Sequence, residues 1–85
     1  MELKAQFEKA VEESKSLSSK PSNETLLLLY SLFKQATEGD APDDGPSNPF
    51  DFVAKAKHSA WSEQKGKARE LVMNEYISLV GKLKG

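Results

Sequence analysis

The chain has 85 residues, with 12 lysines and arginines against 13 aspartates and glutamates, so its formal net charge is −1. This balance argues against a general nucleic-acid binder, although clustered lysines could still form a local anion site. Cysteine is absent, which excludes disulfides, thiolate zinc sites and cysteine nucleophiles and fits a reducing compartment. We expect one small domain over residues 1–85, stabilised by helix packing.

Nothing in the sequence predicts a membrane anchor or an export signal. No apolar run approaches the roughly 20 residues that span a bilayer. The N-terminal residues Met1-Glu2-Leu3-Lys4 are charged and lack the apolar centre of a signal peptide. We therefore expect a soluble, cytoplasmic protein without stable membrane insertion.

The first helix is predicted over about residues 3–17, where apolar side chains recur at near-helical spacing. Pro21 disfavours helix at Lys20, and Ser22 or Asn23 can then accept hydrogen bonds from the free amides of a second helix. The apolar positions of the first helix are Leu3, Phe7, Ala10, Val11 and Leu17.

The second helix is predicted over about residues 22–37, before Gly39. Residues 26–30 are apolar on nearly all sides of this helix, which indicates burial against more than one neighbour and a central position. Residues 39–50 are rich in proline, glycine, aspartate and asparagine, so we expect a long loop there. A loop of this length can cross one end of a bundle and let the helices on either side of it run the same way.

Two further helices are predicted, over about residues 52–64 and 67–83. Asp51 can cap the third helix, and Gly66 can provide a left-handed stop after it. The fourth helix has no serine or threonine cap at its start. We expect the third helix to pack inward through Phe52, Ala56, Ala60 and Trp61, and the fourth through Ala68, Leu71, Val72, Tyr76, Leu79, Val80 and Leu83.

Aromatic and cationic side chains occur together in the second and third helices. Tyr30, Phe33 and Lys34 stand at i, i+3 and i+4, so they share one helix face. Each also has an ordinary structural interpretation when taken alone. A lysine near the end of a helix favours the negative end of the dipole, and aromatic residues at helical spacing usually pack. Lys55 and Lys57 could equally be solvated surface lysines.

Taken together, these segments resemble the acyl-CoA-binding protein family over almost the whole chain. The resemblance implies an all-α four-helix bundle in up-down-down-up order, with a ligand bowl among the helices. The matching segments are Tyr30, Lys34-Gln35-Ala36-Thr37, Gly39-Asp40, Asp51-Phe52, Lys55-Ala56-Lys57, Ala60-Trp61, Lys65-Gly66 and Tyr76-Ile77.

The resemblance also implies a ligand site. By analogy with the family, Tyr30, Lys34 and Lys57 hold the 3′-phosphate of the CoA nucleotide, and Tyr76 lies at the adenine. A hydroxyl with two ammonium groups suits a phosphate, and an aromatic face suits a purine. Lys15 is a weaker candidate for the diphosphate or pantetheine. Val11, Leu26 and Leu27 are candidates for an acyl-chain groove.

This chain departs from the family pattern at two positions near the site. Phe33 stands where the family commonly has tyrosine, so ring packing is kept while a hydroxyl is lost. His58 stands where the family usually has tryptophan, and we expect it to be a packing residue and not a catalyst.

Three hypotheses follow for the function. The favoured one is a monomeric, non-enzymatic carrier of medium- to long-chain acyl-CoA that buffers the acyl-CoA pool and delivers its ligand to acyl-CoA-using enzymes. The alternative is a helical protein-interaction module without affinity for CoA. An acyl-CoA hydrolase or transferase is disfavoured because one histidine and no cysteine leave no nucleophile paired with a base. We expect no catalytic residue, no metal site and no cofactor other than the acyl-CoA ligand.

Overall fold

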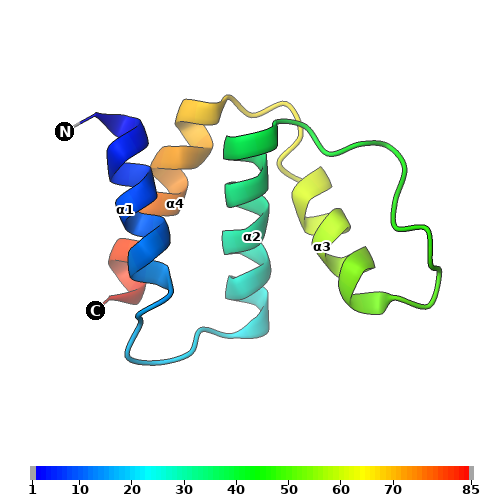
Figure 1. Cartoon of the computed structure of the whole chain (residues 1–85), viewed down its shortest axis with the longest axis horizontal. Coiled ribbons are helices and arrows are strands. Elements are labelled where there is room, and N and C mark those ends of the chain that lie inside the picture. Colours follow the sequence, from blue (N-terminus) through cyan, green and yellow to red (C-terminus); the bar gives the residue numbers. More distant parts are fainter. Residues whose placement is uncertain (1, 85) are drawn as a thin grey trace.

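The computed structural model describes residues 2–84, and that part of the chain forms helices and loops without any strand. Its helices are α1 (Leu3–Ser14), α2 (Asn23–Glu38), α3 (Phe52–Ser62) and α4 (Arg69–Leu83). In Figure 1, α1 and α4 run in one direction while α2 and α3 run in the other. The predicted all-α, up-down-down-up fold is therefore confirmed. Within residues 2–84, no helix has both the length and the apolar character needed to cross a membrane.

Helix α2 lies in the middle of the molecule. It packs against α4 on one side and against α3 on the other, while α1 packs against α4. Figure 1 shows the loop after α2 running the length of α3 before that helix begins. This long connection is what allows α2 and α3 to run the same way. The Cα atoms span 40 × 28 × 15 Å, so the four helices form a shallow body.

Two of the helices begin with the caps that the sequence predicts. The Ser22 side chain accepts a hydrogen bond from the Thr25 amide at 3.2 Å, and the Asp51 side chain accepts one from the Ala54 amide at 3.0 Å. Each cap satisfies a backbone N–H that has no partner within its helix. As expected, α4 begins without a side-chain cap.

The helix ends differ from the predicted ones by a few residues. Helix α1 ends at Ser14, because the amides of Lys15 and Ser16 bond three residues back and tighten the last turn. Helix α4 starts at Arg69, since Ala68 before it is extended with ψ 149°. Helix α3 ends at Ser62, and the turn after it reaches a glycine at position 66 with φ 87°, in the predicted left-handed region.

The buried core lies between α1, α2 and α4. The rings of Phe7 and Tyr76 meet edge to face at 5.1 Å in its centre. Of the leucines at positions 26–29, only Leu29 is fully buried, so the prediction that this whole run is buried was too broad. Phe52 is 71% exposed, and its predicted inward packing was wrong. The core consists of Phe7, Ala10, Leu29, Leu32, Ala36, Val72, Tyr76 and Val80.

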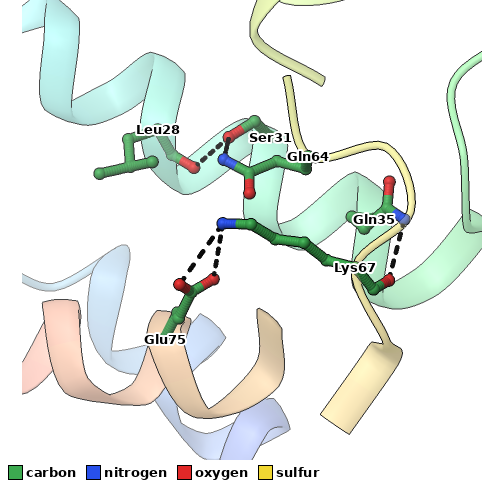
Figure 2. A network of polar contacts seen from close by, with 6 residues as sticks. All are labelled: Leu28, Ser31, Gln35, Gln64, Lys67 and Glu75. Carbon is green, nitrogen blue, oxygen red and sulfur yellow. Dashed lines mark hydrogen bonds and ion pairs between the residues drawn. The ribbon is translucent and has the colours of Figure 1, made fainter. Parts of the chain in front are cut away.

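Polar contacts tie the turn between α3 and α4 to the buried side of α2. Figure 2 shows the Gln64 amide donating to Ser31 Oγ at 3.2 Å, while the Gln35 amide donates to the carbonyl oxygen of Lys67 at 3.1 Å. The Lys67 ammonium in turn lies 3.4 Å from a carboxylate oxygen of Glu75 on α4. Because Gln35 and Gln64 are almost fully buried, these hydrogen bonds satisfy side-chain N–H groups that could not reach water, while the side-chain oxygens of both residues are buried without a hydrogen-bond partner among residues 2–84.

Candidate functional site

Two lysines converge on the ring of Tyr30. The Lys34 ammonium lies 5.9 Å from the ring centroid, and the Lys57 ammonium lies 5.4 Å from it. Tyr30 and Lys34 are one turn apart on α2, whereas Lys57 comes from α3. Packing of α3 on α2 therefore builds a group of two cations and one aromatic ring, which we call the Tyr30 cluster (Tyr30, Lys34 and Lys57). Two ammonium groups near one ring are a candidate anion site in a chain of nearly neutral charge.

Trp61 provides a second aromatic face for Lys34. The Lys34 ammonium lies 4.9 Å from the Trp61 ring, and the Trp61 indole N–H donates to the carbonyl oxygen of Gly39 at 2.8 Å. This hydrogen bond holds the ring at the point where α2 ends. Lys34 also forms an ion pair with Glu38. The sequence predicted Trp61 only as a core residue; its position one turn after Lys57 was the signal that it borders the same site.

An apolar pocket of about 460 Å³ adjoins the Tyr30 cluster. It lies between α2 and α3, and Tyr30 and Lys57 belong to both the pocket and the cluster. A ligand in this position meets cations at one end and apolar side chains at the other. The pocket is lined by Asn23, Leu26, Leu27, Tyr30, Phe52, Val53, Ala56 and Lys57. Sequence reasoning did not assign Phe52 and Val53 to it, because exposure of these side chains is decided by packing.

A second pocket of about 520 Å³ lies among α1, α2 and α4. Val11 and Phe33 line it, and the Phe33 ring stacks on Phe7 with a centroid distance of 6.1 Å and an interplanar angle of 22°. The structure thus places Val11 apart from Leu26 and Leu27, in a different pocket. Phe33 likewise faces α1, while the Tyr30 cluster faces α3.

The two remaining sequence candidates lie outside both pockets. Tyr76 is only 4% exposed, and its hydroxyl donates to Ser14 Oγ at 3.0 Å, so its ring is covered in this structure. Lys15 lies on the exposed turn after α1, where its ammonium is 3.8 Å from a carboxylate oxygen of Glu12. A contact between either residue and a ligand remains a prediction.

The loop beside the site is held by hydrogen bonds. Asp40 accepts from the Gly66 amide and from the Gln35 side chain, each at 2.8 Å, and these bonds hold the pKa of its carboxyl below the ordinary value. His58 Nε2 lies 2.7 Å from the carbonyl oxygen of Pro42, which gives this histidine a structural role. Within residues 2–84, no group of three or more histidine, cysteine, aspartate or glutamate side chains is placed to hold a metal.

Comparison with known proteins decides the family. Residues 4–80 match the family model described as "Acyl CoA binding protein". This chain belongs to the acyl-CoA-binding protein family.

Individual relatives agree with that assignment. The chain is 47% identical to acyl-CoA-binding protein homolog 1 of Caenorhabditis elegans, over 91% of this chain and 88% of the relative. It is 42% identical to the acyl-CoA-binding protein of Brassica napus, over 98% of this chain and 89% of the relative. The crystal structure of Oryza sativa acyl-CoA-binding protein 2 superposes with a TM-score of 0.88 at 40% identity, covering 95% of this chain and 87% of that one.

The structure also shows what several of the family-like residues do in this chain. Gln35 and Asp40 join the end of α2 to the turn before α4, and Gly39 supplies a φ of 82° together with the carbonyl that Trp61 binds. These residues shape the scaffold, whereas Lys34, from the same segment, points its ammonium at the aromatic rings. One short segment thus combines structural side chains with a lysine that faces the rings of Tyr30 and Trp61.

Proposed function

We propose that this protein binds medium- to long-chain acyl-CoA thioesters, transports them and buffers their free concentration. The observation that carries the proposal is the continuity between the Tyr30 cluster and the apolar pocket between α2 and α3. A phosphorylated head group matches the paired ammonium groups, and a fatty acyl chain matches the apolar walls. Family membership and the close structural relatives support the same ligand.

Within this proposal, Lys34 and Lys57 bind the 3′-phosphate of the nucleotide, and the Tyr30 hydroxyl donates to it. The acyl chain occupies the α2–α3 pocket beside Leu26 and Leu27. Phe33 and Val11 line the second pocket, so their contact with the ligand requires the ligand to extend into the pocket among α1, α2 and α4. On the family resemblance, Lys15 is assigned to the diphosphate or pantetheine, and Tyr76 is assigned to the adenine. Contact between Tyr76 and the ligand requires the Tyr76 ring to become accessible.

We also propose that the protein acts without catalysis, as a cytoplasmic monomer that delivers its ligand to acyl-CoA-using enzymes. Its one histidine, His58, is engaged with the carbonyl oxygen of Pro42, and the chain has no cysteine. A thioester carbonyl would therefore lack the nucleophile–base pair that acyl transfer needs. The proposal includes no metal, no cofactor and no nucleic-acid partner.

Calorimetry with three ligands tests the function. Palmitoyl-CoA is expected to bind far more tightly than CoA, and palmitate is expected to bind poorly, because only the thioester uses both halves of the site. Native mass spectrometry of freshly purified protein provides a second readout, as a retained acyl-CoA adduct. Equal affinity for palmitate and palmitoyl-CoA would refute the carrier function, and no affinity for any of the three ligands would favour a protein-interaction module.

A further inference from the structure

Glu38 is the last residue of α2, and it forms an ion pair with Lys34 one turn earlier. The Lys34 side chain is 21% exposed, so most of it is covered by neighbouring residues. The Glu38 side chain is 53% exposed and can leave the pair by rotating into solvent. The lysine is therefore held in place while its carboxylate partner is free to move.

The position of Glu38 is unfavourable for the helix itself. A carboxylate at the C-terminal end of a helix meets the negative end of the helix dipole. The order of the pair, with Lys34 before Glu38, is also the weaker orientation for an ion pair spaced four residues apart. Helix stability therefore does not account for a glutamate at this position, and its interaction with the Tyr30 cluster becomes the relevant one.

The two lysines of the Tyr30 cluster differ in whether a carboxylate is paired with them. Within residues 2–84, Lys57 contacts the Tyr30 ring but has no carboxylate within ion-pair distance, whereas Lys34 has Glu38. An anion that approaches the cluster meets one available ammonium and one that is already neutralised. To use both cations, the anion must either displace the Glu38 carboxylate or lie beside it against like-charge repulsion.

We propose that Glu38 is an affinity-setting residue that competes with the phosphate of the ligand for the Lys34 ammonium. This inference rests on the proposed function, since it takes Lys34 as a phosphate ligand. In the free protein Glu38 neutralises Lys34; on binding, the phosphate takes over the ammonium and Glu38 turns to solvent. As the ligand leaves, Glu38 returns to Lys34, so the exchange weakens binding and favours release. Such weakening suits a carrier that must hand its ligand on.

The substitution Glu38→Gln removes the competing charge and keeps the side-chain shape. It is expected to tighten binding of palmitoyl-CoA by about two- to fivefold, the range that a partly exposed ion pair corresponds to. Binding of palmitoyl-dephospho-CoA, which lacks the 3′-phosphate, is expected to stay unchanged. Calorimetry measures both affinities, and the fluorescence of Trp61, the one tryptophan of the chain, provides an independent signal beside Lys34.

Glu24→Gln is the matched control, because it makes the same change of charge on the first turn of α2. About 21 Å of helix separate the two glutamates, which exceeds the distance over which physiological salt screens exposed charges. This control is expected to leave both affinities unchanged. Circular dichroism of each variant verifies that the helices are retained.

A double-mutant cycle with Lys34→Ala separates competition from general repulsion. If Glu38 acts through Lys34, the gain from Glu38→Gln disappears in the Lys34→Ala background. A gain that persists there, or one that is equally large with the dephospho ligand, overturns the inference, as does an unchanged affinity for palmitoyl-CoA in Glu38→Gln. Wild-type protein that fails to bind palmitoyl-CoA at all refutes the proposed function itself, and that result is distinct from the others.

Discussion

The roles of single side chains in the Tyr30 cluster depend on the residues that surround them. Lys34 taken alone is a lysine near a helix end, and Lys57 taken alone is a surface lysine. With both ammonium groups within 6 Å of one tyrosine ring and Lys34 also facing Trp61, they are a candidate site for a compact anion. Single substitutions in the Tyr30 cluster therefore test the head-group chemistry.

We expect Lys34→Ala and Lys57→Ala each to weaken binding of palmitoyl-CoA by about 1.5–3 kcal/mol, because each removes a charge-assisted hydrogen bond. Lys55→Ala, on the same helix as Lys57, is the control and is expected to change affinity little. Calorimetry with the intact and dephospho ligands measures the effect. If the two variants lose equal affinity for both ligands, these lysines do not bind the 3′-phosphate.

Substitutions of Phe33 test whether its ring contributes to ligand affinity or only to stability. Because its ring stacks on Phe7 and lines the pocket among α1, α2 and α4, Phe33→Ala is expected to lower both stability and affinity. Phe33→Tyr retains the ring and is expected to preserve stability, with about 0.5–1.5 kcal/mol of added affinity where the hydroxyl reaches the ligand. Thermal melts without ligand and calorimetry with palmitoyl-CoA separate the two effects. Loss of stability alone in Phe33→Ala would make Phe33 a core residue and remove it from the site.

Hydrogen bonds connect the end of α2 with α3 and with the turn before α4. Gln35, Asp40 and Gly66 link the end of α2 to the turn before α4, while Trp61 bonds back to Gly39 from α3. The Trp61 bond joins α3 to the residue after α2, and Lys57, one turn before Trp61, lies at the Tyr30 ring. The same hydrogen bonds therefore contribute both to stability and to the geometry of the site.

The Asp40 carboxylate gives this connection a pH dependence. Its pKa is lowered in the folded protein, first by the Gly66 amide and then by the Gln35 side chain. A lowered pKa means that the charged form stabilises the fold above the ordinary carboxyl pKa of about 4, and that this contribution is lost as the pH falls through the lowered value. Asp40→Asn should therefore reduce the melting temperature at pH 7 and change it much less near pH 2. Equal reductions at both pH values would show that the carboxylate charge is not responsible.

As a whole, the molecule is a shallow body in which the two pockets described above flank α2. Helix α3 packs on α2 through one side, which leaves Phe52 and Val53 exposed at the mouth of the α2–α3 pocket. An acyl chain that binds in this pocket would cover these exposed apolar side chains and would itself be removed from water. Varying the length of the acyl chain therefore tests how much of the ligand the apolar pocket covers.

We expect affinity to rise with acyl-chain length by up to about 0.8 kcal/mol per buried CH₂ and then to level off. The rise reflects transfer of methylene groups from water into the pocket, and the plateau marks the length at which additional groups remain in water. Calorimetry across saturated acyl-CoA lengths measures both. A flat dependence on length would show that the acyl chain lies outside the apolar pocket.

The sequence by itself determined which segments are helical, where Ser22 and Asp51 cap them, and that Tyr30 and Lys34 share a face. These properties depend on neighbours within one turn, which spacing and side-chain type specify directly. The family resemblance alone grouped Lys57 with Tyr30, and their contact depends on the packing of α3 on α2. Only the tertiary structure decided that Val11 lies in a different pocket from Leu26 and that Phe52 is exposed. Which helix face meets which neighbour depends on packing summed over the whole core, and no local spacing contains that information.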